Sequence, residues 1–313
     1  MVGIAGNNYS MAIKPNSIQR VLYKIDRDVL RILGFWPYFY CQRTLGFPIV
    51  KLEFYKKVRY WPNLKNPKSF NEKVTHKKLY GRNPLLPIIA DKYRVREYVR
   101  SLIGEEYLIP LLQVLETPEE INFELLPDEF IIKTNFSSGL NILIENKHEV
   151  RQKKIKAQLS HWMDMKYGYR NLVWFAQEIP RKILIERLLR NSNGDIPCDY
   201  KFFVFHGEVE FIQVDFDRFT KHSRMLYDKE WKKLNFTIRN DLQNTEGVAK
   251  PNNLQIMLEI AKELAKNFSF MRVDLYSCSN TIFFGELTPF PTSGRTRFHP
   301  PNVDFEIGKL WKL

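Results

Sequence analysis

Residues 270–294 read FMRVDLYSCSNTIFFGELTPFPTSG, and this pattern predicts a β-hairpin. Apolar and polar residues alternate on both sides of a short polar segment centred on Asn280, which is typical of a turn. Each arm carries one carboxylate, Asp274 on the first and Glu286 on the second, and Arg272 lies beside the first. A turn centred on Asn280 pairs Asp274 with Glu286, so both acids project from one face with Cβ atoms roughly 5 Å apart.

Two carboxylates at this separation repel each other unless positive charge lies between them. Three arrangements are compatible with the pattern: both acids face solvent, one acid pairs with Arg272, or the two acids bind a cation. Carboxylate oxygens near phosphates are common ligands of Mg²⁺, and a neighbouring arginine suits the charge of a transferring phosphoryl group. The hairpin by itself leaves the three alternatives open.

The composition is that of a globular protein rather than a disordered one, with 44% hydrophobic and 14% aromatic residues among 313. A chain of this length forms one large domain or two to three small lobes. No apolar run reaches the roughly 18 residues that a membrane-spanning helix needs, and we expect no export signal because residues 1–20 lack an apolar core. Cys41, Cys198 and Cys278 are scattered without metal-ligand spacing, so we expect core thiols in a reducing, cytoplasmic compartment.

The positive charge is concentrated at one end of the sequence. Residues 1–100 hold 20 Lys and Arg against 6 Asp and Glu, whereas the remaining 213 residues hold 28 against 29. Aromatic residues are interleaved with this charge in residues 34–67, GFWPYFYCQRTLGFPIVKLEFYKKVRYWPNLKNP. Such a surface suits an anionic partner: nucleic acid, acidic lipid headgroups or an anionic glycan. A solvated basic face without a ligand is the simpler alternative, and nucleic acid is disfavoured because no nucleic-acid-binding motif accompanies the charge.

Periodicity predicts a helical first third followed by α+β structure with antiparallel hairpins. Ser69 and Glu72 form a capping-box pattern at the start of a predicted helix over 70–80. Further helices are expected over 17–33, 90–104, 148–165 and 253–268. Strands are expected over 129–136, 140–145 and 181–189, and a second hairpin over 200–216 is expected to turn at His206 and Gly207.

Three charged residues in these strands are candidates for a nucleotide site. Lys133 precedes a loop of small residues whose backbone N–H groups suit a phosphate, although a lysine on a surface hairpin is the simpler explanation. Glu186 lies in an apolar strand and needs a partner, either Arg187 or Arg190 at the strand end or the sugar of a nucleotide. Lys201 either forms a solvated pair with Asp199 or is a second cation directed at phosphates.

The order of six motifs resembles that of the ATP-grasp ligases, the superfamily of D-alanine–D-alanine ligase. The motifs are ADK (90–92), IIKTNFSSG (131–139), ILIERLL (183–189), DYKFF (199–203), MRVDLY (271–276) and GELTPFPTSG (285–294). Within that superfamily, residues 69–99 and 128–144 look like the TupA-like branch found in surface-polysaccharide and teichuronopeptide biosynthesis. The resemblance covers residues 67–313.

The resemblance implies an α+β ATP-grasp fold in which two lobes with antiparallel sheets grip ATP, together with a helical, basic N-terminal region. We expect a basic aromatic extension over 1–66, an N-terminal ATP-grasp region over 67–125, a small lid-like subdomain over 126–190, and a catalytic subdomain over 191–313.

The resemblance also implies roles for individual residues. Lys92 and Lys133 are expected at the nucleotide phosphates, beneath a closing loop formed by Ser137, Ser138 and Gly139. Glu186 and Leu189 are expected at the adenine and ribose, with Lys201 near the phosphates. Asp274 and Glu286 are expected to hold Mg²⁺, with Mn²⁺ as an alternative, and Thr288 stands where many superfamily members have an asparagine ligand. Arg272 and Lys133 are the expected catalytic residues.

Two segments depart from the pattern of the branch. Thr134-Asn135-Phe136-Ser137 stands where the branch usually has a sequence like CNHG, and Pro289 and Thr292 also differ. Because the lysines and acids persist, we interpret the departures as altered specificity rather than lost activity.

The implied activity is that of an ATP-dependent carboxylate–amine ligase working through an acyl phosphate. The expected acceptor is a uronic acid of a capsular or other surface polysaccharide, free or as a lipid- or nucleotide-linked precursor, and the expected nucleophile is an amino acid or amine. We expect a cytoplasmic protein in peripheral contact with the inner face of the plasma membrane. The alternatives are a glycosyltransferase, against which the lack of a DxD-type motif counts, and a silent glycan- or nucleotide-binding module.

Overall fold

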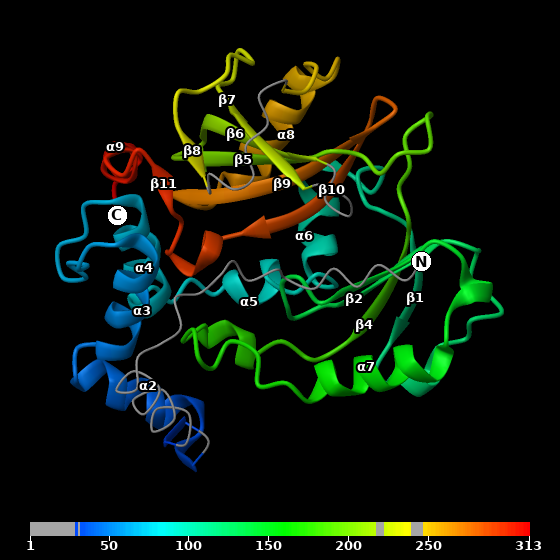
Figure 1. Ribbon diagram of the computed structural model, residues 1–313, viewed down its shortest axis with the longest axis horizontal. Coiled ribbons are helices and arrows are strands. Elements are labelled where there is room, and N and C mark those ends of the chain that lie inside the picture. Colours follow the sequence, from blue (N-terminus) through cyan, green and yellow to red (C-terminus); the bar gives the residue numbers. More distant parts are fainter. Residues whose placement is uncertain (1–28, 31, 217–221, 239–246) are drawn as a thin grey trace.

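The computed structural model describes residues 29–30, 32–216, 222–238 and 247–313, and these form two main antiparallel sheets flanked by helices (Figure 1). The smaller sheet has the order β1-β4-β2-β3 and the larger one the order β10-β9-β5-β6-β7. A short two-stranded sheet pairs β11 with β8. In Figure 1 the larger sheet lies in the upper half of the molecule and the smaller sheet in the lower half.

The smaller sheet consists of β1 (Leu111–Leu115), β4 (Ile183–Arg187), β2 (Phe130–Thr134) and β3 (Asn141–Ile144). Helix α7 (Gln152–Asp164) packs against it through an apolar stripe at helical spacing, formed by Ile155, Leu159 and Trp162. Strands β2 and β4 supply buried isoleucines to the same cluster. This packing gives the smaller sheet its own hydrophobic core.

The larger sheet consists of β10 (Thr281–Thr288), β9 (Phe270–Cys278), β5 (Asp199–Phe205), β6 (Glu208–Phe216) and β7 (Ser223–Tyr227). One face is apolar and packs against α8 (Leu254–Ala265). The other face is divided along the strands. At one end, Phe203, Phe270 and other aromatic residues pack against α4 (Phe70–Tyr80) and the segment around α9 (Val303–Lys309). At the other end the same face carries charged residues, and these form the candidate site described below.

The remaining elements are short or lie towards the N-terminus. They are α2 (Phe35–Thr44), α3 (Pro48–Val58), α5 (Leu86–Ile89), α6 (Val95–Ile103), β8 (Thr237–Ile238) and β11 (Phe298–His299), with 3₁₀ turns at Pro118–Glu120, Lys147–Glu149, Trp174–Gln177 and Pro291–Ser293. Helices α2 and α3 lie at the lower left of Figure 1, away from the larger sheet.

The expected α+β class and the two antiparallel hairpins are confirmed. Helix α4 begins with the predicted capping box, because the Ser69 hydroxyl accepts from the Glu72 backbone and the Glu72 carboxylate accepts from the Ser69 backbone. Most of the helix expected over 17–33 lies outside the described residues. The expected subdomain boundaries stay a prediction. The expectation of core thiols is wrong: Cys41 is exposed, and Cys198 and Cys278 are only half-buried.

Candidate functional site

The predicted pairing of Asp274 with Glu286 is confirmed, but the hairpin reaches it through a bulge. The turn consists of Ser279 and Asn280, whose φ angles of 49° and 70° suit a two-residue turn. From that turn, regular pairing would place Glu286 opposite Val273, on the apolar face. Gly285 is an extra residue on β10, and it shifts the register so that Glu286 faces Asp274. A Cβ at position 285 would lie 2.9 Å from the Asp274 carbonyl oxygen, so glycine permits this close approach.

Arg272 lies between the two acids and contacts both. Its Nε donates to Asp274 Oδ1 (2.7 Å) and its Nη2 to Asp274 Oδ2 (2.6 Å). The same Nη2 donates to Glu286 Oε1 (2.9 Å) and to the Thr288 hydroxyl (3.0 Å). Arg272 and Asp274 are largely buried, with 13% and 4% of their side chains exposed, whereas 34% of Glu286 is exposed. Of the alternatives left open by the sequence, ion pairing with Arg272 is therefore the one seen, and it involves both carboxylates.

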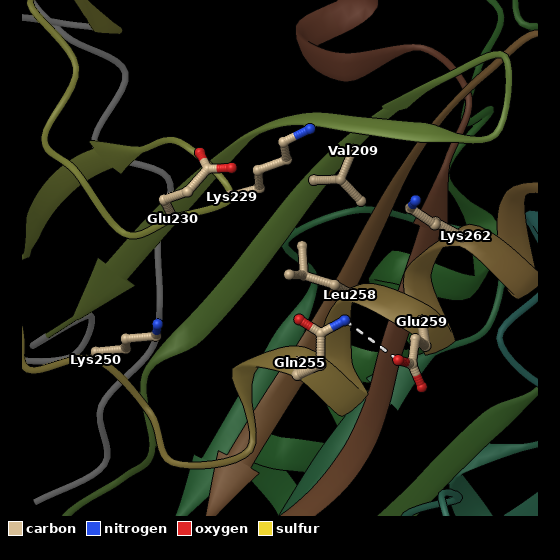
Figure 2. Close-up of a pocket in the computed structure, with 8 residues that line it drawn as sticks. All are labelled: Val209, Lys229, Glu230, Lys250, Gln255, Leu258, Glu259 and Lys262. Atoms are coloured by element: carbon tan, nitrogen blue, oxygen red, sulfur yellow. Dashed lines mark hydrogen bonds between the residues drawn. The ribbon is translucent and has the colours of Figure 1, made fainter.

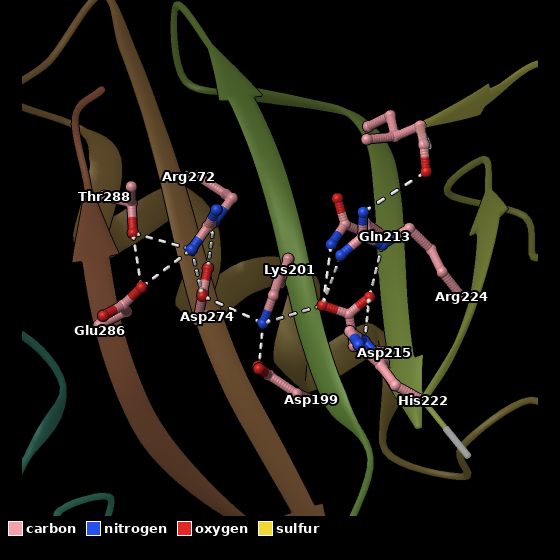
Figure 3. Close-up of polar contacts among 11 residues, drawn as sticks. Asp199, Lys201, Gln213, Asp215, His222, Arg224, Arg272, Asp274, Glu286 and Thr288 are labelled. Carbon is pink, nitrogen blue, oxygen red and sulfur yellow. Dashed lines mark hydrogen bonds and ion pairs between the residues drawn. The ribbon is translucent and has the colours of Figure 1, made fainter. Parts of the chain in front are cut away.

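The charged network continues across β5 and β6 (Figure 3). The Lys201 ammonium group contacts Asp199 on its own strand, Asp274 on β9 (3.3 Å) and Asp215 on β6 (3.7 Å). The alternative of a solvated Lys201–Asp199 pair is half right. The pair forms, but both residues are buried rather than exposed to solvent. Arg224 on β7 binds Asp215 through Nε (2.6 Å) and Nη2 (3.1 Å). One polar face thus connects all five strands of the larger sheet.

Sequence reasoning did not select the β6–β7 part of this network. Besides Asp215 and Arg224 it includes Gln213, whose side-chain amide donates to Asp215 (3.0 Å), and His222, which lies 3.5 Å from it. Strands β5 and β6 contain a bulge at Glu210, which places Lys201 opposite Gln213 and Asp199 opposite Asp215. The missed signal is the pair of polar residues Gln213 and Asp215, which lie on one face within the buried second half of β6.

Burial and neighbouring charges shift the pKa values of the two candidate ligands in opposite directions. Burial raises the pKa of Asp274 to about 6, against the opposing effects of Arg272 and Lys201. Burial also acts upward on Glu286, but Arg272, Lys92 and Lys201 together lower its pKa to about 2. Glu286 is therefore ionised throughout the physiological range, whereas Asp274 takes up a proton at mildly acidic pH.

Two lysines expected at the nucleotide phosphates lie near the hairpin: Lys133 on β2 of the smaller sheet and Lys92 in the turn between α5 and α6. Lys92 lowers the pKa of Glu286, and the pKa of Lys92 is itself lowered by burial, with Glu286, Lys133 and Glu186 among the charges that act on it. The Lys133 ammonium group pairs with the Glu186 carboxylate at 2.5 Å, across neighbouring strands β2 and β4. The alternative that pairs Glu186 with Arg187 or Arg190 is therefore wrong, because the register of β2 and β4 makes Glu186 and Lys133 diagonal neighbours on one face of the sheet.

Lys92 stabilises the loop after β2 through hydrogen bonds to its backbone. The Lys92 ammonium group donates to the carbonyl groups of Thr134 (3.2 Å) and Ser137. The Ser137 hydroxyl contacts the Thr134 hydroxyl, and the backbone N–H of Ser138 donates to the Tyr167 hydroxyl (3.1 Å). Gly139 has a φ of 79°, a conformation that favours glycine. Leu189 is buried just beyond β4. No contact links Ser138, Gly139 or Leu189 directly to the carboxylates of β9 and β10 within the described part of the chain.

The donor set of the hairpin fits a divalent cation of the Mg²⁺ type. Asp274, Glu286 and Thr288 each direct one oxygen at a single cationic atom, Arg272 Nη2. Hard oxygen donors converging on one point are what Mg²⁺ prefers. No group of three or more His, Cys, Asp or Glu residues is arranged as a metal site in the residues described. The remaining ligands would therefore come from water and from phosphates, as is usual for this ion.

An open cavity of about 480 Å³ lies elsewhere, on the α8 side of the larger sheet (Figure 2). Val209 and Leu258, which line it, belong to the hydrophobic cluster of α8, so the cavity and the charged network are on opposite faces. Its polar lining is Lys229, Glu230, Lys250, Gln255, Glu259 and Lys262. None of the sequence-derived site residues contributes to it.

Within the described ranges, no helix combines the length and the apolar character needed to cross a bilayer.

Comparisons with solved structures give distant similarities. The chain shares 15% identity with D-alanine–D-alanine ligase from Helicobacter pylori, with a TM-score of 0.42 over 77% of this chain and 65% of that one. With the Bacillus anthracis enzyme complexed with ATP it shares 14% identity, with a TM-score of 0.38 over 65% of this chain and 54% of that one. The chain therefore spans about half of that ligase. With a D-cycloserine synthetase it shares 9% identity, with a TM-score of 0.40 over 72% of this chain and 70% of that one.

No curated protein matches the sequence significantly. A sequence profile described as TupA-like ATP-grasp matches residues 72–312, which include every candidate site residue named above. That span is well over half of the chain, and the chain therefore belongs to the TupA-like ATP-grasp family.

Proposed function

We propose that this protein is an ATP-dependent carboxylate–amine ligase that amidates a sugar acid of a surface polysaccharide, or of its precursor, with an amino acid or another amine. The observation that carries the proposal is the meeting of two sets of side chains. Asp274, Glu286 and Arg272 come from the larger sheet, and Lys92 and Lys133 come from the side of the smaller sheet. Oxygen ligands for a divalent cation and cations for phosphates, in one place, are what phosphoryl transfer requires.

In the proposed reaction an oxygen of the acceptor carboxylate attacks the γ-phosphorus of ATP. The bond between that phosphorus and the bridging oxygen breaks, its electrons leave with ADP, and an acyl phosphate forms. A neutral amine then attacks the acyl carbon, phosphate departs, and the nitrogen loses a proton to give the amide. The protein contributes position and charge neutralisation in both steps.

The side chains divide this work among them. Lys92 and Lys133 bind the nucleotide phosphates under the loop Ser137–Gly139, Glu186 and Leu189 border the ribose and adenine, and Lys201 supports the phosphate side. Asp274, Glu286 and Thr288 hold Mg²⁺ or Mn²⁺, which when bound screens the charge of the phosphates. Arg272 leaves its bridging position and turns to the transferring phosphoryl group, because its Nη2 atom lies where the three oxygens converge.

The nature of the acceptor rests on charge and family context. The excess of positive charge in residues 1–100, interleaved with aromatic residues, suits an anionic glycan or its lipid- or nucleotide-linked form. The same charge suits a lipid-linked precursor at an anionic membrane surface, so we place the enzyme in the cytoplasm at the inner membrane surface. Nucleic acid is not proposed as a partner.

A nucleotide-binding module without turnover is the second candidate. It is favoured by the Lys133–Glu186 pair and by the bridging Arg272, since both cations are neutralised within the protein.

Release of ADP separates the two candidates. The full chain is incubated with ATP, Mg²⁺, glucuronate or galacturonate, and single amino acids, and ADP is measured with a coupled assay. The proposed ligase releases ADP only when a productive acid is present, and it forms phosphate and amide in equal amounts. If the protein binds ATP but no acid–amine pair elicits ADP, the ligase proposal fails and the binding module stands.

A double variant tests the metal assignment. In Asp274→Asn with Glu286→Gln, ATP binding should lose its dependence on Mg²⁺, because both charged ligands are gone while the shape is kept. Asp195→Asn, in an exposed loop after β4, serves as the matched control and should bind as the wild type does. Retention of the full Mg²⁺ dependence in the double variant would show that the metal is held elsewhere.

A further inference from the structure

The charged face of the larger sheet has a second half, on β6 and β7, to which the reaction proposed above gives no task (Figure 3). Lys201 connects this half to the hairpin, because its ammonium group contacts Asp274 of β9 (3.3 Å) and Asp215 of β6 (3.7 Å). A phosphoryl group bound by Arg272 and Lys201 would therefore adjoin both halves of the face.

Asp215 is a fixed negative charge in the second half. It is buried, and it accepts from two nitrogens of Arg224 (2.6 and 3.1 Å) and from the Gln213 amide (3.0 Å). Burial acts upward on the pKa of Asp215, but Arg224, His222 and Lys201 together hold that pKa well below its usual value. The carboxylate is therefore ionised throughout the physiological range.

His222 directly precedes β7 and faces this carboxylate. Its Nε2 atom is buried and lies 3.5 Å from Asp215 Oδ1, whereas 32% of the side chain as a whole is exposed. In a neutral imidazole the nitrogen that faces a carboxylate carries the hydrogen, so Nε2–H points at Asp215 and Nδ1 keeps the lone pair. The part of the ring outside this contact thus holds the nitrogen that can accept a proton.

His222 is also the side chain of this face that is best suited to accept a proton. Guanidinium groups do not give up their protons at neutral pH, and an imidazole takes up and releases one readily. The carboxylates drawn in Figure 3 already pair with cations: Asp199 with Lys201, Asp215 with Arg224, and Asp274 and Glu286 with Arg272. Among the described residues of the face, the imidazole is therefore the base that stands outside the ion pairs between acids and lysine or arginine.

We propose that His222, oriented by Asp215, accepts the proton that the attacking amine loses in the second step of the ligation. This role rests on the function proposed above. As the amine nitrogen bonds to the acyl carbon, the bond from that carbon to the phosphate oxygen breaks, and phosphate leaves with the electron pair. The proton of the nitrogen passes to the imidazole and from there to solvent, while the Asp215 carboxylate stabilises the imidazolium.

Two nucleophiles separate this step from the one before it. The full chain is given ATP, Mg²⁺ and glucuronate or galacturonate, together with either the amino acid that supports ADP release or hydroxylamine. Hydroxylamine is largely unprotonated and strongly nucleophilic at neutral pH, so it traps the acyl phosphate as a hydroxamate without the help of a base. We expect His222→Gln to form the amide about 100-fold more slowly, the loss typical of a general base, and to form the hydroxamate at the wild-type rate.

Further variants distinguish proton transfer from a structural role. His222→Gly should show the same selective loss, and added imidazole should restore its amide formation, which a structural role does not predict. Asp215→Asn should also lower the ratio of amide to hydroxamate, because the ring is no longer held in one orientation. His161→Gln, at an exposed position of α7, is the matched control and should form both products as the wild type does.

The ratio of the two products decides the outcome. If this ratio is the same in His222→Gln as in the wild type, whether both products persist or both are lost, His222 does not serve the amine step and the proposal is overturned. Turnover by the wild type then leaves the ligase function standing. If the wild type itself forms neither hydroxamate nor amide from any acid, the function proposed above fails, and this role of His222 fails with it.

Discussion

The guanidinium group of Arg272 offsets the repulsion between the two carboxylates of the hairpin. Its guanidinium group is the positive charge between Asp274 and Glu286, and its removal leaves two acids facing each other on a mostly buried surface. In Arg272→Met without metal we expect a loss of about 3–5 kcal/mol in the free energy of unfolding, the usual cost of breaking a buried pair from one side. Urea unfolding in the presence of EDTA measures it.

Mg²⁺ should restore much of that loss, because the ion can now occupy the position that Arg272 leaves. The stabilisation by Mg²⁺ is therefore expected to be larger in the variant than in the wild type. Arg100→Met, which removes an arginine from exposed pairs with Glu97 and Glu105, is the control and should change little. If Mg²⁺ stabilises Arg272→Met no more than it stabilises Arg100→Met, the three oxygens around Arg272 do not form a cation site.

The buried Lys78 predicts a pH dependence of stability. Its pKa is lowered by burial and by Arg295, and Glu53 and Arg170 are the other charged residues that line the small cavity beside it. Between that lowered pKa and the usual value near 10.5, the unfolded chain binds more protons than the folded one, so stability rises with pH. Relative to Lys78→Met, the wild type should gain stability from pH 7 to pH 9 in urea unfolding.

The same comparison with Lys262→Met should show no relative gain, because the ammonium group of Lys262 lies at the surface, paired with Glu208. Parallel pH profiles for the wild type and Lys78→Met would mean that the ammonium group is stabilised by something other than the described neighbours.

At the scale of the element, a bulge determines which side chains meet. Strict alternation from a turn centred on Asn280 pairs Asp274 with Glu286. The observed turn is centred half a residue earlier, between Ser279 and Asn280, and the extra residue Gly285 restores the same pairing. The bulge at Glu210 has no such compensation, and strict alternation along β6 puts Val209 and Phe211 on one face although they pack on opposite faces. Period-two reasoning therefore fails beyond a bulge, since the extra residue reverses the pattern.

Gly285→Ala tests the structural role of the bulge. The added Cβ would lie 2.9 Å from the Asp274 carbonyl oxygen, so the two strands must separate or the register must change. We expect a loss of about 1–3 kcal/mol in the free energy of unfolding, as for other overpacked positions, together with a weaker response to Mg²⁺. Thr281→Ala, at an exposed position of the same strand, is the control. An alanine at 285 that leaves both quantities unchanged would show that β10 tolerates a regular register.

For the helices, local signals were sufficient where both partners lie close in sequence. The capping box of Ser69 and Glu72 fixes the start of α4, and Gly104 ends α6 as expected. The contacts that α4 makes with the loop after β10 are separated by more than 200 residues, as in the pair of Asn71 and Thr296. No local propensity encodes such a contact, so it can be seen only in the fold.

At the scale of the whole molecule, the order of the motifs predicted the ATP-grasp fold, and the match to the family profile confirms it. The sequence did not predict that Lys133 pairs with Glu186, or that Lys92, between α5 and α6, acts on Glu286 of the larger sheet. Both depend on strand register and on how the two sheets approach each other, which are properties of tertiary packing. The sequence therefore supplied candidate residues one by one, whereas their mutual contacts could be seen only in the fold.

The distribution of surface character also belongs to the whole molecule. Helix α2 buries Phe35 and Phe39 on one side and exposes Trp36 and Tyr40, one helical turn apart, on the other. Exposed aromatic side chains within a strongly basic region are typical of proteins that lie on anionic membranes, where the rings enter the headgroup layer. We expect the full chain to sediment with vesicles containing phosphatidylglycerol and to dissociate as salt screens the charge.

The variant Trp36→Ser with Tyr40→Ser should bind these vesicles several-fold more weakly, because the rings supply the apolar part of the attachment while the lysines and arginines supply only the salt-sensitive part. Leu125→Ser, which removes an apolar side chain that is 78% exposed at the other end of the fold, is the matched control. Neutral phosphatidylcholine vesicles should bind neither protein appreciably. If the double variant binds as the wild type does, the exposed rings have no part in membrane attachment. If neutral vesicles bind the wild type as well as anionic ones do, the basic charge of the first hundred residues has no part in it.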